Sequence, residues 1–311
     1  MPATRDQIHG SLLGLAVGDA LGAPYEGLPD GVIAGLVKSG HVLDDPTEAT
    51  LYYTDDTQMM IGVAETLADR GEIDGDALMA AFVANYDPDR GYGPGATMLL
   101  QAVREGEAGP DMALNLFPGG SLGNGAAMRV APVGLLFADD LDRVADQAAL
   151  SARPTHLHPI GIDGARILAL AVALATPGGR LRRREFFGEL ARRAETEEFR
   201  WQLEMAARLG PSDTVGPFGN GLEAHRSVTT AIAIFAASPD DYPRVVRRAI
   251  GQGGDTDTLA AMAGALAGAR VGIDAIPAHL LARLEDSTGG RAYIEALADR
   301  LFEGHRLRVG P

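Results

Sequence analysis

Helical periodicity runs through most of this 311-residue sequence and leaves little room for other secondary structure. Apolar residues recur at three- and four-residue steps, and helix-favouring Ala, Leu and Met are prominent among them. The best strand signal, Thr50-Leu51-Tyr52-Tyr53, is short. The pattern therefore predicts an all-α fold. Its clearest helical segments are Gln7–Leu21, Thr57–Asp69, Ala77–Tyr86, Ala126–Phe137, Gly161–Ala175, Arg184–Ala194, Ala224–Ala237, Tyr242–Ile250, Thr258–Ala269 and Arg291–Phe302.

One domain over residues 1–311, a single compact orthogonal bundle of many helices, is the simplest organisation. No fixed-period repeat and no low-complexity linker divides the sequence. Gly10, Gly14 and Gly18 lie four residues apart in the first helical segment, so they share one helix face. Each costs up to ~1 kcal/mol of helix propensity relative to Ala. We therefore expect a second helix to pack closely on this face and offset the cost.

The composition excludes several classes of function. Cysteine is absent, which removes disulfides, zinc–thiolate sites and cysteine nucleophiles. Lys38 is the only lysine and no G-x-x-x-x-G-K-[ST] motif occurs, so lysine chemistry and a P-loop are excluded. With 42 acidic against 27 basic residues, the formal net charge of −15 argues against general nucleic-acid binding.

The sequence carries no membrane or export signal. The N-terminal residues Met1–Asp6 are polar, and the longest apolar stretch, Ile167–Ala175, has nine residues. A bilayer span needs about 20. We therefore expect a cytoplasmic protein without a membrane partner.

Two acidic clusters, Thr54-Asp55-Asp56 and Asp255-Thr256-Asp257-Thr258, each run directly into a helical pattern. Helix capping explains either one alone, because Asp and Thr are preferred N-caps. A cap needs only one acceptor, however, and each cluster offers two carboxylates and at least one hydroxyl. Adjacent carboxylates repel each other unless a cation intervenes, and oxygen-only ligands suit Mg²⁺ or Mn²⁺. We therefore predict two converging helix ends around a pair of divalent cations, with the active site between them.

Two glycine-rich segments, Gly93–Thr97 and Gly119–Gly125, precede helical patterns. Such a segment lets backbone N–H groups bind phosphate, although two ordinary turns explain the glycines equally well. Thr155-His156-Leu157-His158 has no third ligand for a zinc site; one histidine facing a ligand is more plausible, with His158 structural.

Three further residues, outside these segments, also have expected roles. Asp19 is expected to bond backbone groups beyond the first helix, whereas Glu26 follows the break in that helix and could reach a cavity. An ion pair to a neighbour is expected for Arg129.

In this order, the motifs resemble those of the ADP-ribosylglycohydrolase family, which includes the dinitrogenase reductase-activating glycohydrolase. They cover residues 10 to about 270, most of the chain. The matching residues are Gly10-Ser11-Leu12-Leu13-Gly14 with Gly18-Asp19-Ala20-Leu21-Gly22, Thr54-Asp55-Asp56-Thr57, Gly91-Tyr92-Gly93, Gly123-Asn124-Gly125-Ala126-Ala127-Met128-Arg129-Val130, Thr155-His156 and Gly253-Gly254-Asp255-Thr256-Asp257-Thr258.

The resemblance implies an all-α domain with two Mg²⁺ or Mn²⁺ ions at the base of an ADP-ribose cleft. It implies as metal ligands Glu26, Thr54, Asp55, Asp56, Asp255, Asp257 and Thr258. The substrate would be held by the two glycine-rich segments and the first histidine, through Gly93, Gly95, Thr97, Gly119, Gly120, Ser121, Leu122, Gly123, Asn124, Gly125 and His156.

The reaction implied is hydrolysis at ribose C1″, with Glu26, Asp55 and Asp56 catalytic and Glu26 or Asp56 as the base. The substrate would be an ADP-ribosylated protein or a small ADP-ribosyl conjugate. Likeness to the dinitrogenase-reductase type favours an arginine linkage over serine, an acetyl ester or a nucleic-acid base. Two alternatives stay open: a family member that binds ADP-ribose without cleaving it, and a two-metal phosphohydrolase acting on a nucleotide diphosphate.

Overall fold

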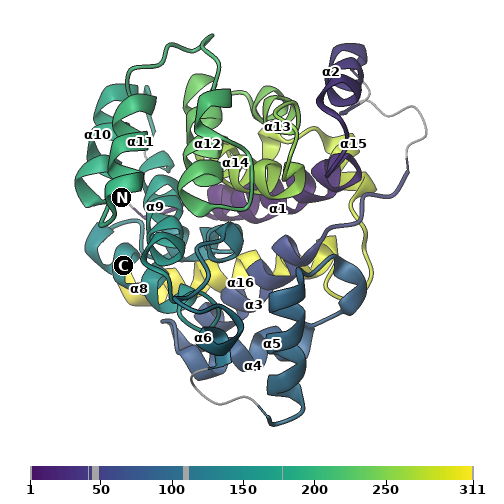
Figure 1. The fold of residues 1–311 in the computed structure, drawn as a ribbon, viewed down its shortest axis with the longest axis vertical. Coiled ribbons are helices and arrows are strands. Elements are labelled where there is room, and N and C mark those ends of the chain that lie inside the picture. Colours follow the sequence, from purple (N-terminus) through teal and green to yellow (C-terminus); the bar gives the residue numbers. More distant parts are fainter. Residues whose placement is uncertain (1, 41, 44–48, 108–111, 177, 310–311) are drawn as a thin grey trace.

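The computed structural model describes residues 2–40, 42–43, 49–107, 112–176 and 178–309, and this part of the chain is built from helices (Figure 1). No strand of two or more residues occurs in it. The predicted strand Thr50–Tyr53 is reduced to an isolated bridge between Leu51 and Leu284, and a second bridge joins Gly123 to Glu223. The predicted all-α class is confirmed, and the single-domain organisation stays a prediction.

The helices have the following bounds in chain order: α1 (Arg5–Gly22), η1 (Ala23–Tyr25), α2 (Asp30–Ser39), α3 (Asp55–Arg70), α4 (Gly75–Asn85), η2 (Pro88–Arg90), α5 (Pro94–Arg104), α6 (Met112–Leu116), η3 (Asn124–Ala126), α7 (Ala131–Leu136), α8 (Leu141–Ala152), α9 (Pro159–Ala175), α10 (Arg183–Arg193), α11 (Glu197–Ala206), η4 (Gly216–Phe218), α12 (Ala224–Ala237), α13 (Tyr242–Ile250), α14 (Thr256–Val271), η5 (Ile273–Ala275), α15 (Ala278–Arg283) and α16 (Arg291–Val309).

One predicted helix is wrong in its extent. The apolar pattern over Ala126–Phe137 suggested a continuous helix, but the chain forms the short 3₁₀ helix η3 and then begins α7 at Ala131. Pro132 lies in the first turn of α7. Proline is tolerated there, where its missing N–H is not needed, but it would break a helix that ran through it.

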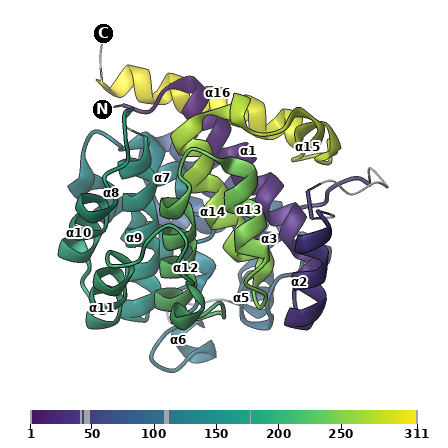
Figure 2. The ribbon, with the colours of Figure 1, turned by 90° about the horizontal axis from the view of Figure 1, so that it is seen from above.

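The predicted glycine face on α1 is confirmed, and its partner is α14. The two helices lie side by side at the centre of the molecule (Figures 1 and 2). A Cβ atom on Gly18 would lie 2.3 Å from the carbonyl oxygen of Ala260, and one on Gly14 would lie 2.7 Å from that of Gly264. Both distances are far below van der Waals contact, so only glycine permits this approach.

Because the helices run antiparallel, the end of α1 meets the start of α14. The hydroxyl of Thr256 donates a hydrogen bond to the carbonyl oxygen of Gly22 at 2.9 Å. This packing brings the second acidic cluster beside the segment that carries Glu26.

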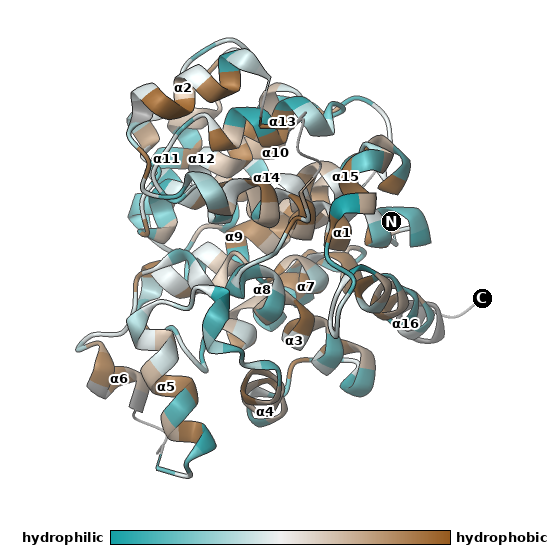
Figure 3. Cartoon of the chain, turned by 90° about the vertical axis from the view of Figure 1, so that its right-hand side faces the viewer, coloured by the Kyte–Doolittle hydropathy of each residue, from teal (hydrophilic) through white to brown (hydrophobic). Residues whose placement is uncertain are grey.

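Apolar residues fill the centre of the bundle, whereas outer helices carry hydrophilic residues on their exposed faces (Figure 3). Every residue of α14 from Thr256 to Ala269 is buried, and α9 is buried over most of its length. Within the described residues, no helix combines the length and hydropathy that a membrane crossing requires.

Candidate functional site

A cleft of about 840 Å³ opens where the first turns of α3, α5 and α14 converge. Its walls combine acidic, glycine-rich and apolar segments. The residues that line it include Glu26, Asp55, Asp56, Gly93, Gly95, Leu99, Leu116, Phe117, Gly120, Ser121, Leu122, Gly123, Asn124, Gly125, Arg129, His156, Leu222, Glu223, Asp255, Asp257 and Thr258. Thr54, Thr97 and Gly119, which the sequence suggested as site residues, do not line it.

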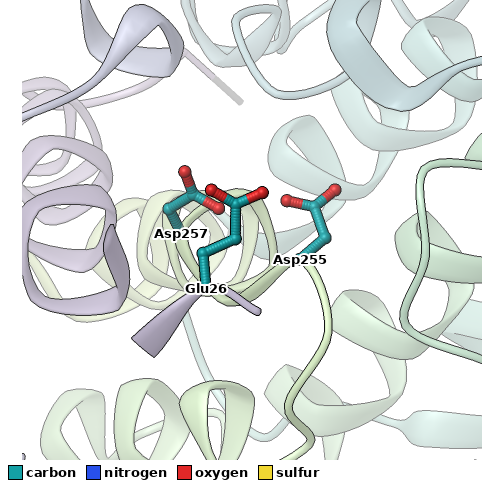
Figure 4. Close-up of side chains that lie close together, drawn as sticks. All are labelled: Glu26, Asp255 and Asp257. Carbon is teal, nitrogen blue, oxygen red and sulfur yellow. The ribbon is translucent and has the colours of Figure 1, made fainter. Parts of the chain in front are cut away.

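Three carboxylates from two segments meet on one side of the cleft. Glu26, which directly follows η1, reaches between Asp255 and Asp257 at the start of α14 (Figure 4). One oxygen atom from each of the three lies within 4.8 Å of the other two. Asp255 occupies the N-cap position of α14, yet its side chain makes no capping hydrogen bond. The capping alternative therefore does not account for this cluster.

In the α3 cluster, one residue caps the helix and two others line the cleft. Thr54 is the N-cap of α3, and its hydroxyl oxygen accepts a hydrogen bond from the Asp56 backbone N–H at 3.3 Å. Asp55 and Asp56 are left to face the cleft. Oδ1 of Asp56 accepts a hydrogen bond from the Thr258 hydroxyl at 3.4 Å, which joins the two clusters, whereas Oδ2 of Asp56 is buried without a hydrogen-bond partner.

Asp19 on α1 fixes the start of α3. Its buried carboxylate accepts hydrogen bonds from the backbone N–H groups of Thr54 and Thr57 and from both hydroxyls. Burial raises the pKa of Asp19 to about 6. The prediction that Asp19 bonds backbone groups beyond the first helix is confirmed. Helix α1 thus holds both acidic clusters, one through Asp19 and the other through its glycine face.

Burial, together with repulsion between neighbouring carboxylates, raises the pKa values of several of these acids. Burial, with a contribution from Asp19, raises the pKa of Asp55 to about 7. Burial, with a contribution from Asp255, raises the pKa of Asp257 to about 9, and burial raises that of Glu26 above its ordinary value. Within the described residues, no arginine or lysine forms an ion pair with any carboxylate of the two clusters. Carboxylates gathered without an ion-pair partner in the described part of the chain, with one buried oxygen unpartnered, fit hard divalent cations.

The segment Gly119–Gly125 forms a wall of the cleft and is held from both sides. Asn124 N donates to the carbonyl oxygen of Leu222 at 2.8 Å, and Ala224 N donates to that of Leu122 at 3.0 Å. A Cβ on Gly120 would lie 2.2 Å from the backbone nitrogen of His158, so glycine is required there. The segment leads into η3 and not into the long helix predicted from the sequence.

Asn124 connects this wall to the acids. Its side-chain amide donates hydrogen bonds to Oδ2 of Asp255 at 2.7 Å and to the hydroxyl of Ser227 at 3.1 Å. Asn124 therefore orients a carboxylate of the α14 cluster.

The segment Gly93–Thr97 begins α5, with Gly93 as N-cap and Pro94 in the first turn. A Cβ on Gly95 would lie 2.2 Å from the ring of Phe117, so this glycine makes room for an aromatic side chain that lines the cleft. The hydroxyl of Thr97 instead bonds the carbonyl oxygen of Tyr92 at 3.4 Å.

His156 faces the cleft from a buried position. Its Nδ1 lies 2.7 Å from the hydroxyl of Thr155, and burial, aided by Arg129, lowers its pKa to about 3. The ring is therefore neutral at physiological pH. His158 instead caps α9 by accepting a hydrogen bond from Ile160 N at 3.2 Å, which agrees with a structural role.

Arg129 departs from expectation, because no described acidic residue forms an ion pair with it. It donates to the carbonyl oxygen of Ser151 at 3.0 Å and to the hydroxyl of Thr155 at 2.8 Å, and its guanidinium lies 4.5 Å from the ring centre of Phe82. Burial lowers its pKa to about 9. Arg129 and Thr155 are 26 residues apart in the sequence, so no local spacing predicts this contact.

The apolar wall of the cleft was also missed. Leu99, the adjacent Leu116 and Phe117, and Leu222 come from three segments, and their apolar character alone does not distinguish a cleft from a core. Phe117 and Leu222 are exposed, as is Leu122 beside them.

Comparison with known proteins agrees with this arrangement. A family model described as ADP-ribosylglycohydrolase matches residues 1–309. ADP-ribosylhydrolase ARH3 from Danio rerio is 32% identical over 316 residues, covering 87% of this chain and 84% of the relative. The Homo sapiens ARH3 is 32% identical and covers 87% of each chain. The Escherichia coli protein YegU is 32% identical, covering 90% of this chain and 92% of the relative.

A solved structure described as an ADP-ribosylglycohydrolase-related protein complex superposes with a TM-score of 0.73 and 28% sequence identity, covering 97% of this chain and 98% of that one. Both the sequence and the fold are therefore shared over nearly the whole length. The chain belongs to the ADP-ribosylglycohydrolase family, and it is a glycosidase hydrolase.

Proposed function

We propose that this chain removes ADP-ribose from a modified acceptor by hydrolysing the glycosidic bond at ribose C1″, and that it does so with two Mg²⁺ or Mn²⁺ ions. One observation carries the metal dependence: carboxylates from η1, α3 and α14 converge in one cleft without a basic partner among the described residues. Such a cluster is stabilised by divalent cations and costly without them.

The residues that would hold the ions fall into two groups. Glu26, Asp255 and Asp257 form one, and Asp55, Asp56 and Thr258 form the other, which includes the unpartnered Oδ2 of Asp56. Thr54 is the weakest of the seven proposed ligands, because its hydroxyl already bonds Asp19 and the Asp56 N–H. When bound, the ions would polarise a water molecule and orient the ribose hydroxyls beside the scissile bond.

The remainder of the cleft suits the rest of an ADP-ribose group. Its volume of about 840 Å³ is within the usual range for a nucleotide-sized ligand. The backbone of the Gly119–Gly125 segment and the start of α5 would receive the diphosphate. The apolar side chains of Leu99, Phe117 and Leu222 suit the adenine ring, and neutral His156 can donate or accept a hydrogen bond without adding charge.

The chain's acids have two tasks in the proposed reaction. Glu26 would accept the proton of the attacking water, since it is the most exposed carboxylate of the cluster; Asp56 is the second candidate. The buried carboxylates would stabilise the positive charge that develops at C1″ as the bond to the acceptor breaks. The hydroxyl group from water would be added to C1″, and the acceptor would leave with the proton that Glu26 took from that water.

An ADP-ribosylated protein or a small ADP-ribosyl conjugate is the proposed substrate, with arginine as the first linkage to test. A guanidinium acceptor would be attracted by the acidic cluster. Serine, an acetyl ester and a nucleic-acid base are the other linkages.

A release assay tests the proposal. Conjugates with each linkage are incubated with the chain and Mg²⁺, Mn²⁺ or EDTA, and the products are separated by chromatography. We expect free ADP-ribose with either ion and none with EDTA. The variants Asp55→Ala and Asp257→Ala should lose Mn²⁺ binding and turnover together, and full activity in either would contradict the metal centre.

The same assay separates the two alternatives. Binding of ADP-ribose by calorimetry without release from any conjugate would indicate a binding protein. AMP in place of ADP-ribose as the product would indicate a phosphohydrolase.

A further inference from the structure

A largely buried ion pair contacts the residue that precedes the α3 cluster. It joins two segments that are far apart in the sequence. Arg90, the last residue of η2, and Glu285, which follows α15, form a two-pronged contact: Nη1 bonds Oε1, and Nη2 bonds Oε2 at 2.9 Å. The side chain of Arg90 is 13% exposed and that of Glu285 is 5% exposed, so water solvates neither charge well. Neither residue lines the cleft.

This ion pair holds Tyr53, the residue immediately before Thr54, which is the N-cap of α3. Tyr53 N donates to Oε1 of Glu285 at 3.1 Å, and its carbonyl oxygen accepts from Nη1 of Arg90 at 2.9 Å. The guanidinium of Arg90 lies 4.0 Å from the centre of the Tyr53 ring. Both polar backbone groups and the ring of one residue are therefore fixed by a single ion pair.

Further hydrogen bonds hold the irregular segment that leads into α3. Leu51 N donates to the carbonyl oxygen of Arg283 at 2.9 Å, and Glu285 N donates to that of Leu51 at 3.0 Å. The hydroxyl of Tyr53 donates to the carbonyl oxygen of Gly289 at 3.1 Å. No helix or sheet holds residues 51–53, so these contacts, together with those of Asp19, hold the start of α3 in place.

The same ion pair also adjoins a second segment that lines the cleft. Gly91 follows Arg90 directly, and both Gly91 and Gly93 line the cleft. A second link joins these segments, because Oε1 of Gln58 on α3 accepts from Asp87 N at 3.0 Å and from the hydroxyl of Tyr92 at 2.9 Å. A displacement of Arg90 would therefore move Gly91 and Gly93 relative to the α3 cluster.

We propose that Arg90 and Glu285 are positioning residues for the reaction: their ion pair sets the place of Asp55 and Asp56 relative to Gly91 and Gly93, which line the cleft. The inference rests on the proposed metal-dependent function and adds to it two residues from outside the cleft. Outer contacts of this kind orient metal-binding side chains, and their removal commonly weakens metal affinity by about 10- to 100-fold.

The test compares Glu285→Gln with Asp163→Asn. Asp163 offers a matched control, because it is also a buried acid paired with an arginine, Arg166, and bonded to backbone N–H groups, yet it does not line the cleft or contact residues 51–56. Mn²⁺ affinity is measured by calorimetry, kcat and KM with a conjugate that the unmodified chain hydrolyses, and folding by circular dichroism at the same temperature.

We expect Glu285→Gln to bind Mn²⁺ at least about tenfold more weakly and to lose kcat by a similar factor while remaining folded. Asp163→Asn should keep Mn²⁺ affinity within about twofold, even where its melting temperature falls. Unchanged Mn²⁺ affinity in folded Glu285→Gln, or an equal loss in Asp163→Asn, would overturn the positioning role.

Arg90→Lys keeps the proposal testable if Glu285→Gln does not fold. Lysine retains the charge but cannot form the two-pronged contact, so a several-fold loss of Mn²⁺ affinity is expected; affinity equal to that of the unmodified chain overturns the proposal. If the unmodified chain itself binds no Mn²⁺, the proposed function fails and the positioning role fails with it. Normal Mn²⁺ binding and turnover in both variants leaves the proposed function intact and removes the positioning role alone.

Discussion

The two acidic clusters of the cleft face each other, but they are held in place by different physical means. The α14 cluster is positioned by backbone packing, since glycines on α1 bring the start of α14 against Gly22. The α3 cluster is positioned by side-chain polar contacts, from Asp19 on one side and from Arg90 and Glu285 on the other. Helix packing resists single polar substitutions, whereas a side-chain network can be dismantled one bond at a time.

The largest expected effect comes from breaking the packed side. Gly18→Leu places a side chain where even a Cβ would lie 2.3 Å from a backbone oxygen, so α1 and α14 must separate. We expect the free energy of unfolding to fall by about 3 kcal/mol or more, measured by urea denaturation. Gly35→Leu on α2 is the control, because a Cβ there meets no atom within 4 Å, and it should change stability by less than about 1 kcal/mol. Equal effects would refute the packing role.

A smaller loss is expected from the polar side. Asp19→Ala removes the acceptor for the backbone N–H groups and hydroxyls of Thr54 and Thr57, which should cost about 2–3 kcal/mol of stability and weaken Mn²⁺ binding. The control is Asp74→Ala, which removes the N-cap of α4, distant from the cleft. It should cost about 1 kcal/mol and leave Mn²⁺ affinity unchanged. An effect of Asp19→Ala on stability without any on Mn²⁺ affinity would contradict the assigned role.

The pH dependence of stability sharpens the comparison of the clusters. The pKa values of Asp55, about 7, and Asp257, about 9, lie above the ordinary 3.8, so the folded chain retains protons that the unfolded chain has released. In EDTA, the free energy of unfolding should therefore fall as pH rises from 7 to 9, by about 1–2 kcal/mol. His156, whose ordinary pKa of 6.5 is lowered on folding, titrates below this window.

Saturating Mg²⁺ should abolish that fall, because bound cations keep the carboxylates ionised in the folded chain as well. Thermal melts at pH 7, 8 and 9, with EDTA or Mg²⁺, provide the measurement. Parallel pH profiles in the two solutions would argue against a metal centre at these acids.

The smallest expected effect concerns the hydrogen bond between Asn124 and Asp255 of the α14 cluster. Asn124→Ala removes the hydrogen bond to Asp255, and Mn²⁺ affinity should fall several-fold, up to about tenfold. Ser227→Ala, which removes the other partner of the same amide, should change it by less than about twofold. A larger loss of Mn²⁺ affinity in Ser227→Ala than in Asn124→Ala would contradict the role of the Asn124–Asp255 hydrogen bond in metal binding.

Much of the fold could be predicted from local patterns. The glycine spacing in the first helix revealed a close packing face because a helix repeats its surface every three to four residues. The surplus of oxygen atoms in Asp55-Asp56 and Asp255–Thr258 revealed that capping was an incomplete explanation. The break before α7 was not foreseen, because the apolar pattern continues through Pro132 and conceals the end of η3.

Local patterns were sufficient to predict the all-α class, the glycine face of α1 and the chemical nature of the acids, since each depends on neighbouring residues in one segment. The orientation of each site side chain became evident only in the packed fold, because it depends on partners that are distant in the sequence or on another helix. Thr54 turns toward Asp19, Asn124 selects Asp255, and Arg90 meets Glu285. Such contacts form only after the helices have packed, and no local spacing encodes them.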